Sequence, residues 1–418
     1  MANLEELSVA LDIGTTKVVC LVGSVKPGGC VDIKGLGLAT SRGLRNGRII
    51  DIDQTVDAIN QAVDQASDMS GADIAAAYVG IAGEHIVGRK FEGSVSIQTG
   101  TVTEYDIKRC VKNAMILGMS TSSEILAKVP MEYQIDDRTG IQNPVGMCGT
   151  ALGVKLHVFS ADHNALYDMV KCVEDADLAI QNVLLESIAS AESVLYPAEK
   201  QQGVALIDIG GGTTDMAVFI KGSVHHVYEV GFAGDLLSYD LATGLRIPLE
   251  TAGLLKETHG CCFPGLIPDD YVVELVGRDG QGDTRVDASA ACSVLSGRVD
   301  ELLGYLAADL AKSGLEDSVR NIVLTGGTSQ LRGLPQKAVE FFNRPVRVGF
   351  PLNVSGLGDA VVSPIFSTAV GLLLYGLQDN DPLPLNGDGR KASPGFLARL
   401  GRKVRAVFTG AYVQEKTR

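Results

Sequence analysis

The 418-residue chain lacks the marks of several common protein classes. None of its eight cysteines forms a CxxC pair, and Cys261 and Cys262 are adjacent, so the spacing predicts neither a metal centre nor a disulfide framework. No signal peptide opens the chain and no apolar run reaches ~18 residues, which predicts a cytosolic protein with reduced thiols. The formal net charge of −14 argues against nucleic acid as the main ligand.

Two familiar nucleotide-binding motifs are missing as well. The glycines at 210–212 are followed by Thr213 and Thr214 rather than by a GKS or GKT sequence, so this stretch is not a Walker loop. A strand rather than a helix is expected after it, which excludes a Rossmann fingerprint. The chain does contain 45% hydrophobic residues and 49 glycines, a composition typical of a globular α/β protein with many tight turns.

The sequence is organised around two related hairpins. One covers 204–219 (VALIDIGGGTTDMAVF) and the other covers 9–19 (VALDIGTTKVV), and each ends a buried strand at an aspartate, Asp208 or Asp12. Glycines let backbone N–H groups approach an anion, threonine hydroxyls add donors, and a buried carboxylate can hold hydrated Mg²⁺. A single copy is compatible with an ordinary hairpin turn, whereas two copies predict a duplicated domain that grips one polyphosphate from both sides.

The remaining pattern predicts two α/β halves around a central cleft. In the first half we expect strands at 7–25, 30–40 and Ala75–Ile81, and helices at Ile52–Met69, Asn164–Asp175 and Leu184–Tyr196. The second half is expected to repeat the plan, with a hairpin sheet at 204–230, helices at Asp235–Gly244, Leu249–His259, Arg298–Ser313, 334–343 and 365–377, and a strand at Ile322–Leu324.

Between Glu84 and about Ser160 the pattern changes. Short strands at Val95–Ile97 and Leu126–Pro130, with a helix that begins at Thr103, predict a small inserted α+β subdomain. The main sheet is expected to resume at Leu156–Ser160.

The C-terminal residues predict a separate unit. Residues 378–395 combine prolines and glycines with polar residues and predict a flexible linker, and 396–408 (FLARLGRKVRAVF) predict an amphipathic helix lying in a membrane surface. One side carries Phe396, Leu397, Leu400, Val404, Val407 and Phe408, and the other carries Arg399, Arg402, Lys403 and Arg405. The alternative is a helix that docks on the protein's own surface. So short a helix binds a membrane reversibly, so stable attachment needs many copies and points to self-association.

With these features and LTGG at Leu324–Gly327, the chain resembles the bacterial cell-division family FtsA, of the actin-like ATPase superfamily. The matching motifs also include EYQID at Glu132–Asp136, NPVG at Asn143–Gly146, PLN at Pro351–Asn353 and STAVGLL at Ser367–Leu373. The resemblance covers residues 7–377 and the terminal helix.

This resemblance implies an actin-like fold in which two ribonuclease-H-like halves enclose a nucleotide cleft. Its parts would be 1A (7–83, 161–198 and 353–377), an inserted subdomain 1C (84–160), 2A (199–230 and 305–352), 2B (231–304), the linker (378–395) and the membrane helix (396–408). It also implies ATP and Mg²⁺ in the cleft, filaments on anionic inner-membrane lipid at the septum, and binding of the C-terminal peptide of FtsZ. Later division proteins would bind through residues 84–160.

By motif, the resemblance implies two phosphate loops and an adenine site. The implied contacts are Asp12, Gly14, Thr15, Thr16 and Lys17 in the first loop, Asp208, Gly210, Gly211, Gly212, Thr213 and Thr214 in the second, and Gly326 and Gly327 beside the adenine. The two aspartates would hold Mg²⁺ through water.

Other positions are implied less directly. Glu186 occupies the place of a water-orienting catalytic residue, which would act beside Asp208, although it is also compatible with a polar residue at a helix start. Lys256 would line the ribose, but Gly253 replaces the glutamate that the family tends to have three residues earlier. Arg298 and Glu301 match a helix expected to contact FtsZ, and are also compatible with a solvated helix face.

The sequence leaves several functions to compare. The first is a membrane-anchored filament that is at most a slow ATPase. A chaperone of the same fold would need a substrate-binding domain after residue 377, and a sugar or acetate kinase has no use for a basic amphipathic tail. The pilus-assembly protein PilM is similar in fold and insert, but its family lacks the long linker and terminal helix.

Overall fold

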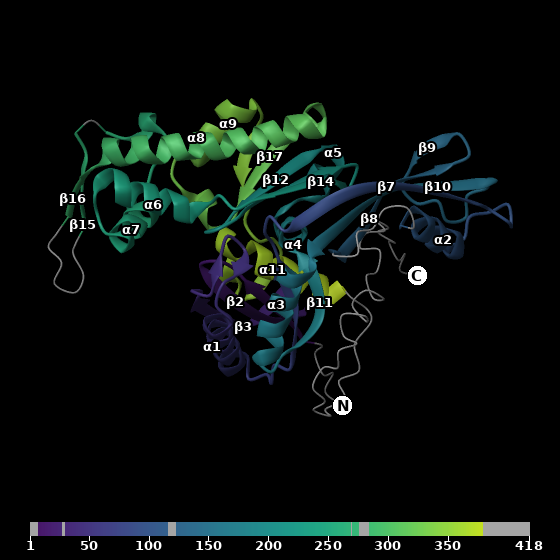
Figure 1. Ribbon diagram of the computed structural model, residues 1–418, viewed down its shortest axis with the longest axis horizontal. Coiled ribbons are helices and arrows are strands. Elements are labelled where there is room, and N and C mark those ends of the chain that lie inside the picture. The colour runs from purple at the N-terminus through teal and green to yellow at the C-terminus, as the bar shows by residue number, and fades with distance from the viewer. Residues whose placement is uncertain (1–6, 27–29, 116–122, 269, 276–283, 379–418) are drawn as a thin grey trace.

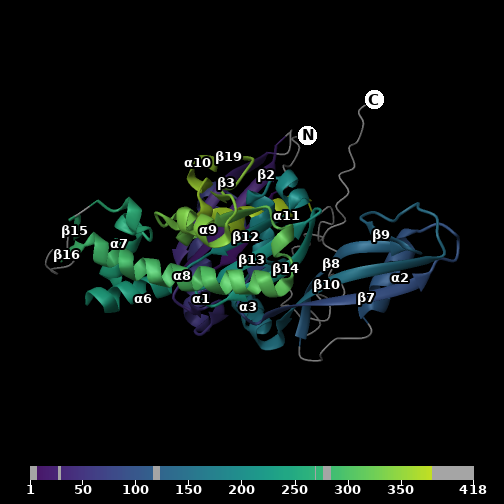
Figure 2. The ribbon, with the colours of Figure 1, turned by 90° about the horizontal axis from the view of Figure 1, so that it is seen from above.

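The computed structural model describes residues 7–26, 30–115, 123–268, 270–275 and 284–378. The predicted linker beyond Gln378 and the predicted helix at 396–408 lie outside these residues. Within the described part of the chain, no helix is long and apolar enough to span a bilayer. Two central sheets form the body of the molecule, and two smaller lobes extend from opposite sides of it (Figures 1 and 2).

The two central sheets share one topology. The first has the strand order β11-β6-β1-β2-β3-β19, and the second has the order β18-β17-β12-β13-β14. In each, a three-stranded antiparallel meander is followed by two parallel strands added to its first strand. Five strands have the same order and direction in both sheets, and β19 adds a sixth, parallel to β3, to the first. The shared five-strand arrangement confirms the predicted duplication. The strands are β1 (Ser8–Ile13), β2 (Lys17–Val25), β3 (Val31–Thr40), β6 (Ala76–Ile81), β11 (Ala179–Leu185) and β19 (Val354–Gly356), then β12 (Val204–Ile209), β13 (Thr214–Ile220), β14 (Ser223–Val230), β17 (Asn321–Thr325) and β18 (Val346–Val348).

Helices of the first half pack on the first sheet, and their ends follow from local sequence. In α1 (Ile52–Ser70), the Asp51 carboxylate accepts a hydrogen bond from the Gln54 N–H, and Gly71 ends the helix with φ of 68°. The predicted helix at Leu184–Tyr196 is partly wrong, because β11 continues through Leu185 before α4 begins. The other elements of this half are the hairpin β4 (Leu44–Arg45) and β5 (Arg48–Ile49), and the helices α3 (His163–Asp175), α4 (Glu186–Val194), α10 (Gly358–Val361) and α11 (Ser367–Gln378). The short helix α5 (Pro197–Gln202) follows α4 and contacts β13 of the second sheet.

The inserted segment forms its own four-stranded sheet, in the order β7-β10-β8-β9, with α2 on one face. Its elements are β7 (Ile86–Ser96), α2 (Glu104–Met115), β8 (Ser123–Ile135), β9 (Arg138–Ile141) and β10 (Ala151–Asp162). The expectation that Leu156–Ser160 rejoins the main sheet is wrong: these residues belong to β10 and pair with β7 and β8. The strands are also much longer than predicted, because β8 and β10 run from the insert into the body.

Those two long strands tie the insert to the body through continuous packing. Their outer residues, such as Ile135 and Leu152, share a core with α2. Their inner residues, including Val129 and Phe159, belong to the large core of the first half, which also includes Phe219 of β13. The insert is therefore a continuous extension of the body, built on the strands that they share.

The second lobe grows from the second half between β14 and β17. It contains α6 (Gly234–Leu245), α7 (Leu249–His259), β15 (Val272–Leu275) and β16 (Thr284–Asp287), and α8 (Ala288–Ser313) and α9 (Leu334–Phe342) run back along the second sheet (Figure 1). The prediction that this long helix begins at Arg298 is wrong. It begins at Ala288, directly after β16, and the Asp287 side chain accepts a hydrogen bond from the N–H of Ser289 at the start of the helix.

Candidate functional site

The two expected phosphate loops meet face to face between the halves. Thr15 and Thr16, between β1 and β2, lie against Gly212 and Gly211, between β12 and β13. A methyl group on either glycine would collide with the opposing threonine side chain. Glycine at these positions therefore lets the halves approach each other, a reason that the sequence alone did not reveal.

Backbone donors in the loops are available to a ligand. The N–H groups of Thr15, Thr16, Gly211 and Gly212 have no acceptor within the described residues. Neighbouring N–H groups in turns of this kind form an anion-binding concavity. Burial raises the pKa of the Asp12 carboxyl, and the positive charge of Lys17 opposes that rise. These groups fit the phosphates of a nucleotide.

Three acidic side chains surround these donors. Asp12 and Asp208 lie one residue before the ends of β1 and β12 and are 4% and 8% exposed, and Glu186 begins α4. Burial raises the pKa of Asp12 to about 6, Lys17 opposes this shift, and Asp208 adds to it. Burial also raises the pKa of Asp208, and burial together with Asp12 raises that of Glu186 well above its usual range. Carboxyls this crowded and desolvated are suited to a cation that would offset their repulsion.

The donor set fits a hydrated ion better than a directly bound one. Among the described residues, no group of three or more His, Cys, Asp or Glu side chains could coordinate a metal. Mg²⁺ typically keeps several waters and takes one or two carboxylates together with substrate phosphates. Asp12 and Asp208 match that arrangement.

Gly326 lies against one of these carboxylates. It follows β17 with φ of 83°, and a side chain there would collide with the Asp208 carboxylate and the Ile209 backbone. Gly327 begins the following turn and lies beside Ile365. The resemblance assigned both glycines to the adenine; the structure adds that Gly326 makes room for Asp208.

The second loop is held from behind by residues that sequence reasoning missed. The N–H groups of Gly234 and Asp235, at the start of α6, donate to the carbonyls of Gly210 and Gly211 at 3.1 and 2.7 Å. The Thr328 hydroxyl also donates to the Gly210 carbonyl, at 2.7 Å. Thr328 could have been found from its position in the TGGTS sequence at 325–329, next to the two glycines expected at the adenine. No local sequence pattern indicates that Gly234 supports the second loop.

Lys256, expected at the ribose, lies next to this support. Its Nζ donates to the Gly234 carbonyl at 2.8 Å, and burial lowers its pKa, with Asp235 opposing the shift. Gly253, one turn earlier on α7, has open space around the position of a side chain. The structure therefore places Lys256 at the second loop and leaves room at 253 for the family's longer side chain.

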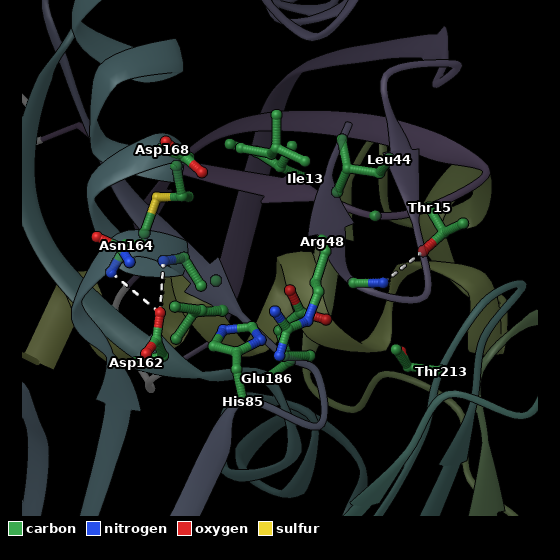
Figure 3. A pocket seen from close by; sticks show the side chains of 18 residues that line it. Ile13, Thr15, Leu44, Arg48, His85, Asp162, Asn164, Asp168, Glu186 and Thr213 are labelled. Atoms are coloured by element: carbon green, nitrogen blue, oxygen red, sulfur yellow. Dashed lines mark hydrogen bonds between the residues drawn. The ribbon is translucent and has the colours of Figure 1, made fainter. Parts of the chain in front are cut away.

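A cavity of about 200 Å³ opens beside the loops, on the side of α3. Glu186, His85 and Arg48 project into it from three different elements (Figure 3). His85 is 7% exposed, and neither ring nitrogen has a partner within the described chain. Burial lowers its pKa to about 4, so the ring is neutral at neutral pH. No sequence pattern indicated this cavity, because its residues are far apart in the chain.

Arg298 is engaged within the protein. Its guanidinium forms ion pairs with Asp240 of α6 and Glu301 of its own helix, and lies 5.4 Å from the centre of the Phe232 ring. Glu301 also receives a 3.5 Å hydrogen bond from the Tyr305 hydroxyl. Of the two residues predicted to face a partner, Arg298 thus links α8 to α6, and Glu301 contacts residues of its own helix.

Comparisons with known proteins agree over nearly the whole chain. The family model for "Cell division protein FtsA" matches residues 205–371, and the model for the "SHS2 domain inserted in FTSA" matches residues 83–160. Cell division protein FtsA of Pseudomonas aeruginosa is 38% identical over 98% of this chain and 100% of its own length. The Neisseria meningitidis protein of the same name is 39% identical over 95% and 98% of the two chains. The chain belongs to the FtsA family.

Solved structures agree on the actin-like fold. A PilM–PilN type IV pilus biogenesis complex superposes with a TM-score of 0.66 at 15% identity, over 89% of this chain and 98% of that one. MreB5 of Spiroplasma citri bound to ADP gives a TM-score of 0.51 at 14% identity, over 88% and 94% of the two chains. At such identities the likeness is one of fold. It confirms the predicted actin-like architecture, and the FtsA relatives favour the division family over the PilM alternative.

Proposed function

We propose that this protein is an ATP-binding, filament-forming division protein that tethers FtsZ to the inner membrane. The observation that carries the proposal is the meeting of the two glycine- and threonine-rich loops, with Asp12 and Asp208 beside their free N–H groups. In a member of the FtsA family, this geometry suits a nucleotide whose binding holds the two halves together.

In the proposed complex the two loops hold the phosphates. The N–H groups of both loops and Lys17 bind phosphate oxygens, and Asp12 and Asp208 bind the waters of Mg²⁺. The metal would neutralise phosphate charge. Glu186 orients water beside the phosphates, and Gly326, Gly327 and Lys256 border the adenosine. Any hydrolysis is slow, and the main role of ATP is to set the filament-competent shape.

The subdomains 1A, 1C, 2A and 2B carry the boundaries given above, and the remaining contacts follow the family. The protein assembles on the cytoplasmic face of the inner membrane at the septum, as a peripheral protein held by 396–408 on anionic lipid. The C-terminal peptide of FtsZ binds the second half, and later division proteins bind 84–160. Because Arg298 pairs with Asp240, Glu301 is the more available of the two expected FtsZ contacts; its side chain is 45% exposed.

Liposome flotation with ATP tests the proposal. The full chain is compared with a chain truncated after Ser393, on vesicles with and without anionic lipid. We expect only the full chain to float, and only with anionic vesicles. Val404→Glu, which places a charge on the apolar side, should behave like the truncation, and Thr409→Glu, just beyond the predicted helix, serves as the matched control. A truncated chain that floats as well as the full one would refute the membrane role.

A further inference from the structure

The Asp208 carboxylate is contacted by two buried hydroxyls, those of Ser190 and Thr368. The Ser190 hydroxyl donates to Asp208 Oδ2 at 2.6 Å, and the hydroxyls of Ser190 and Thr368 are 2.9 Å apart. Thr368 also reaches the same carboxylate oxygen at 3.5 Å. Ser190 is fully buried and Thr368 is 9% exposed, so water does not compete for these bonds.

These contacts join three elements from both halves of the molecule. Asp208 lies next to the end of β12 in the second half, whereas Ser190 lies in α4 and Thr368 in α11, which pack on the first sheet. The hydroxyls of Thr325 and Ser367 lie 2.6 Å apart and extend the polar junction between the halves. The orientation of Asp208 therefore depends on how the two halves meet.

These hydrogen bonds involve only one oxygen of the Asp208 carboxylate, so the other oxygen is available to a ligand. Oδ2 is occupied by the hydroxyls, while Oδ1 has no hydrogen-bond partner within the described residues and lies where Gly326 has no side chain. A hydroxyl that donates to one oxygen of a carboxylate fixes the direction in which the other oxygen faces a bound ion.

We propose that Ser190, assisted by Thr368, is a positioning residue that aims Asp208 at the hydrated Mg²⁺ of the bound nucleotide. This inference rests on the proposed function and adds a role that neither the motifs nor the loops suggested. Its consequence is specific: loss of the Ser190 hydroxyl weakens the dependence of nucleotide binding on Mg²⁺, and leaves binding by the N–H groups of the loops intact.

The test measures ATP affinity of the full chain by fluorescence titration, once with excess Mg²⁺ and once with EDTA. Ser190→Ala should reduce the gain in affinity on adding Mg²⁺ by about 10-fold, with affinity in EDTA unchanged. Thr368→Val should reduce the gain less, in the same direction. The matched control is Ser193→Ala: Ser193 is equally buried in α4, but its hydroxyl donates to the Ser367 carbonyl at 2.7 Å rather than to Asp208.

The control separates positioning from structural damage. Ser193→Ala should lower the melting temperature and leave the Mg²⁺ gain at the wild-type value. If Ser190→Ala and Thr368→Val keep the wild-type gain, or if Ser193→Ala loses as much of it as Ser190→Ala, the inference is overturned while the proposed function stands. A wild-type chain whose ATP binding does not respond to Mg²⁺ would overturn both.

Discussion

Glu229 and Gly83 are joined by a hydrogen bond between the two halves, in which the Gly83 N–H donates to Oε2 of Glu229 at 2.6 Å. A second hydrogen bond runs in the opposite direction between the same two segments: the Gly231 N–H donates to Oε1 of Glu84 at 2.9 Å. Gly83 and Glu84 lie where the chain leaves β6 for the inserted sheet. These paired contacts fasten the base of the insert to the second half, close to the phosphate loops.

The first prediction concerns the charge on Glu229. Burial raises its pKa well above the usual range, and its Oε1 is buried without a partner in the described chain. Glu229→Gln keeps an acceptor for Gly83 and removes the cost of ionising a buried carboxyl. We expect its free energy of unfolding at pH 7.5, measured in urea, to equal or exceed that of the wild type.

Glu229→Ala is the comparison, because it leaves the Gly83 N–H without an acceptor. We expect a loss of about 1–3 kcal/mol in unfolding free energy. A raised folded-state pKa means that the contribution of Glu229 is fully present below its unfolded pKa and is lost as pH rises through the folded value. The advantage of Gln should therefore grow with pH. Equal losses for Gln and Ala would show that the ionised carboxylate is needed.

The second prediction concerns His157, which lies where the insert meets the body. The ring is 2% exposed, and its centre lies 4.2 Å from that of the Phe159 ring, with the two planes tilted by 39°. Burial lowers the pKa of His157 to about 3, and Lys90, His226 and His225 add to the shift. His226 itself pairs with Asp309 at 2.5 Å.

The pKa of His157 is lower in the folded than in the unfolded protein. The contribution of His157 to the free energy of unfolding is therefore fully present above the unfolded pKa and is lost as the pH falls toward 3. We expect the unfolding free energy to decrease by about 1.4 kcal/mol per pH unit from this group alone below pH 6. His157→Gln should flatten the curve, and His163→Gln, at an exposed position, should not. A wild-type slope retained in His157→Gln would contradict this account.

The sequence predicted the parts of this protein that depend on local patterns. The hairpins could be predicted because an apolar run, an aspartate and a glycine turn are adjacent in the chain. Helix α1 could be predicted from its apolar face, with Gly71 as its stop. The start of α8 was missed because small residues such as Ala288 and Ala291, although they favour helix, do not form a clear stripe of large apolar side chains.

Contacts between distant segments could not be predicted in the same way. Leu156–Ser160 has the apolar pattern of either a main-sheet strand or an insert strand, and only its pairing with β7 and β8 decides between them. Ser190 and Asp208 are 18 residues apart, and Thr368 joins them only through the packing of α11 on α4. A serine inside a helix has no pattern that reveals its hydrogen-bond partner.

The third prediction concerns the contact between the loops. Gly212→Ala places a methyl group against the Thr15 side chain, whose hydroxyl already accepts a 3.2 Å hydrogen bond from the Gly47 N–H. The loops must move apart to accommodate the methyl group. If this movement costs about 1–3 kcal/mol in the ATP-bound state, the affinity for ATP should fall by roughly 10-fold or more.

The control for this loop variant is Gly297→Ala. Gly297 lies within α8 with open space around it, so the added methyl should leave ATP affinity unchanged and stabilise the helix by about 0.5–1 kcal/mol. ATP binding that survives in Gly212→Ala would show that the closed contact between the loops is not needed for the ligand.

The last prediction concerns Gly253, where the FtsA pattern tends to have glutamate. A Cβ atom added there would have no neighbour within 4 Å among the described residues, and Lys256 on the next turn already reaches the Gly234 carbonyl behind the second loop. A glutamate at 253 can add a hydrogen bond to the ribose hydroxyls, worth about 0.5–1.5 kcal/mol, so Gly253→Glu should tighten ATP binding by up to roughly 10-fold. Gly253→Ala stabilises α7 equally without that carboxylate and should leave the affinity at the wild-type value. If the alanine variant tightens binding as much as the glutamate does, the gain comes from helix stability; if neither does, the ribose lies elsewhere, and Lys256 serves only to support the second loop.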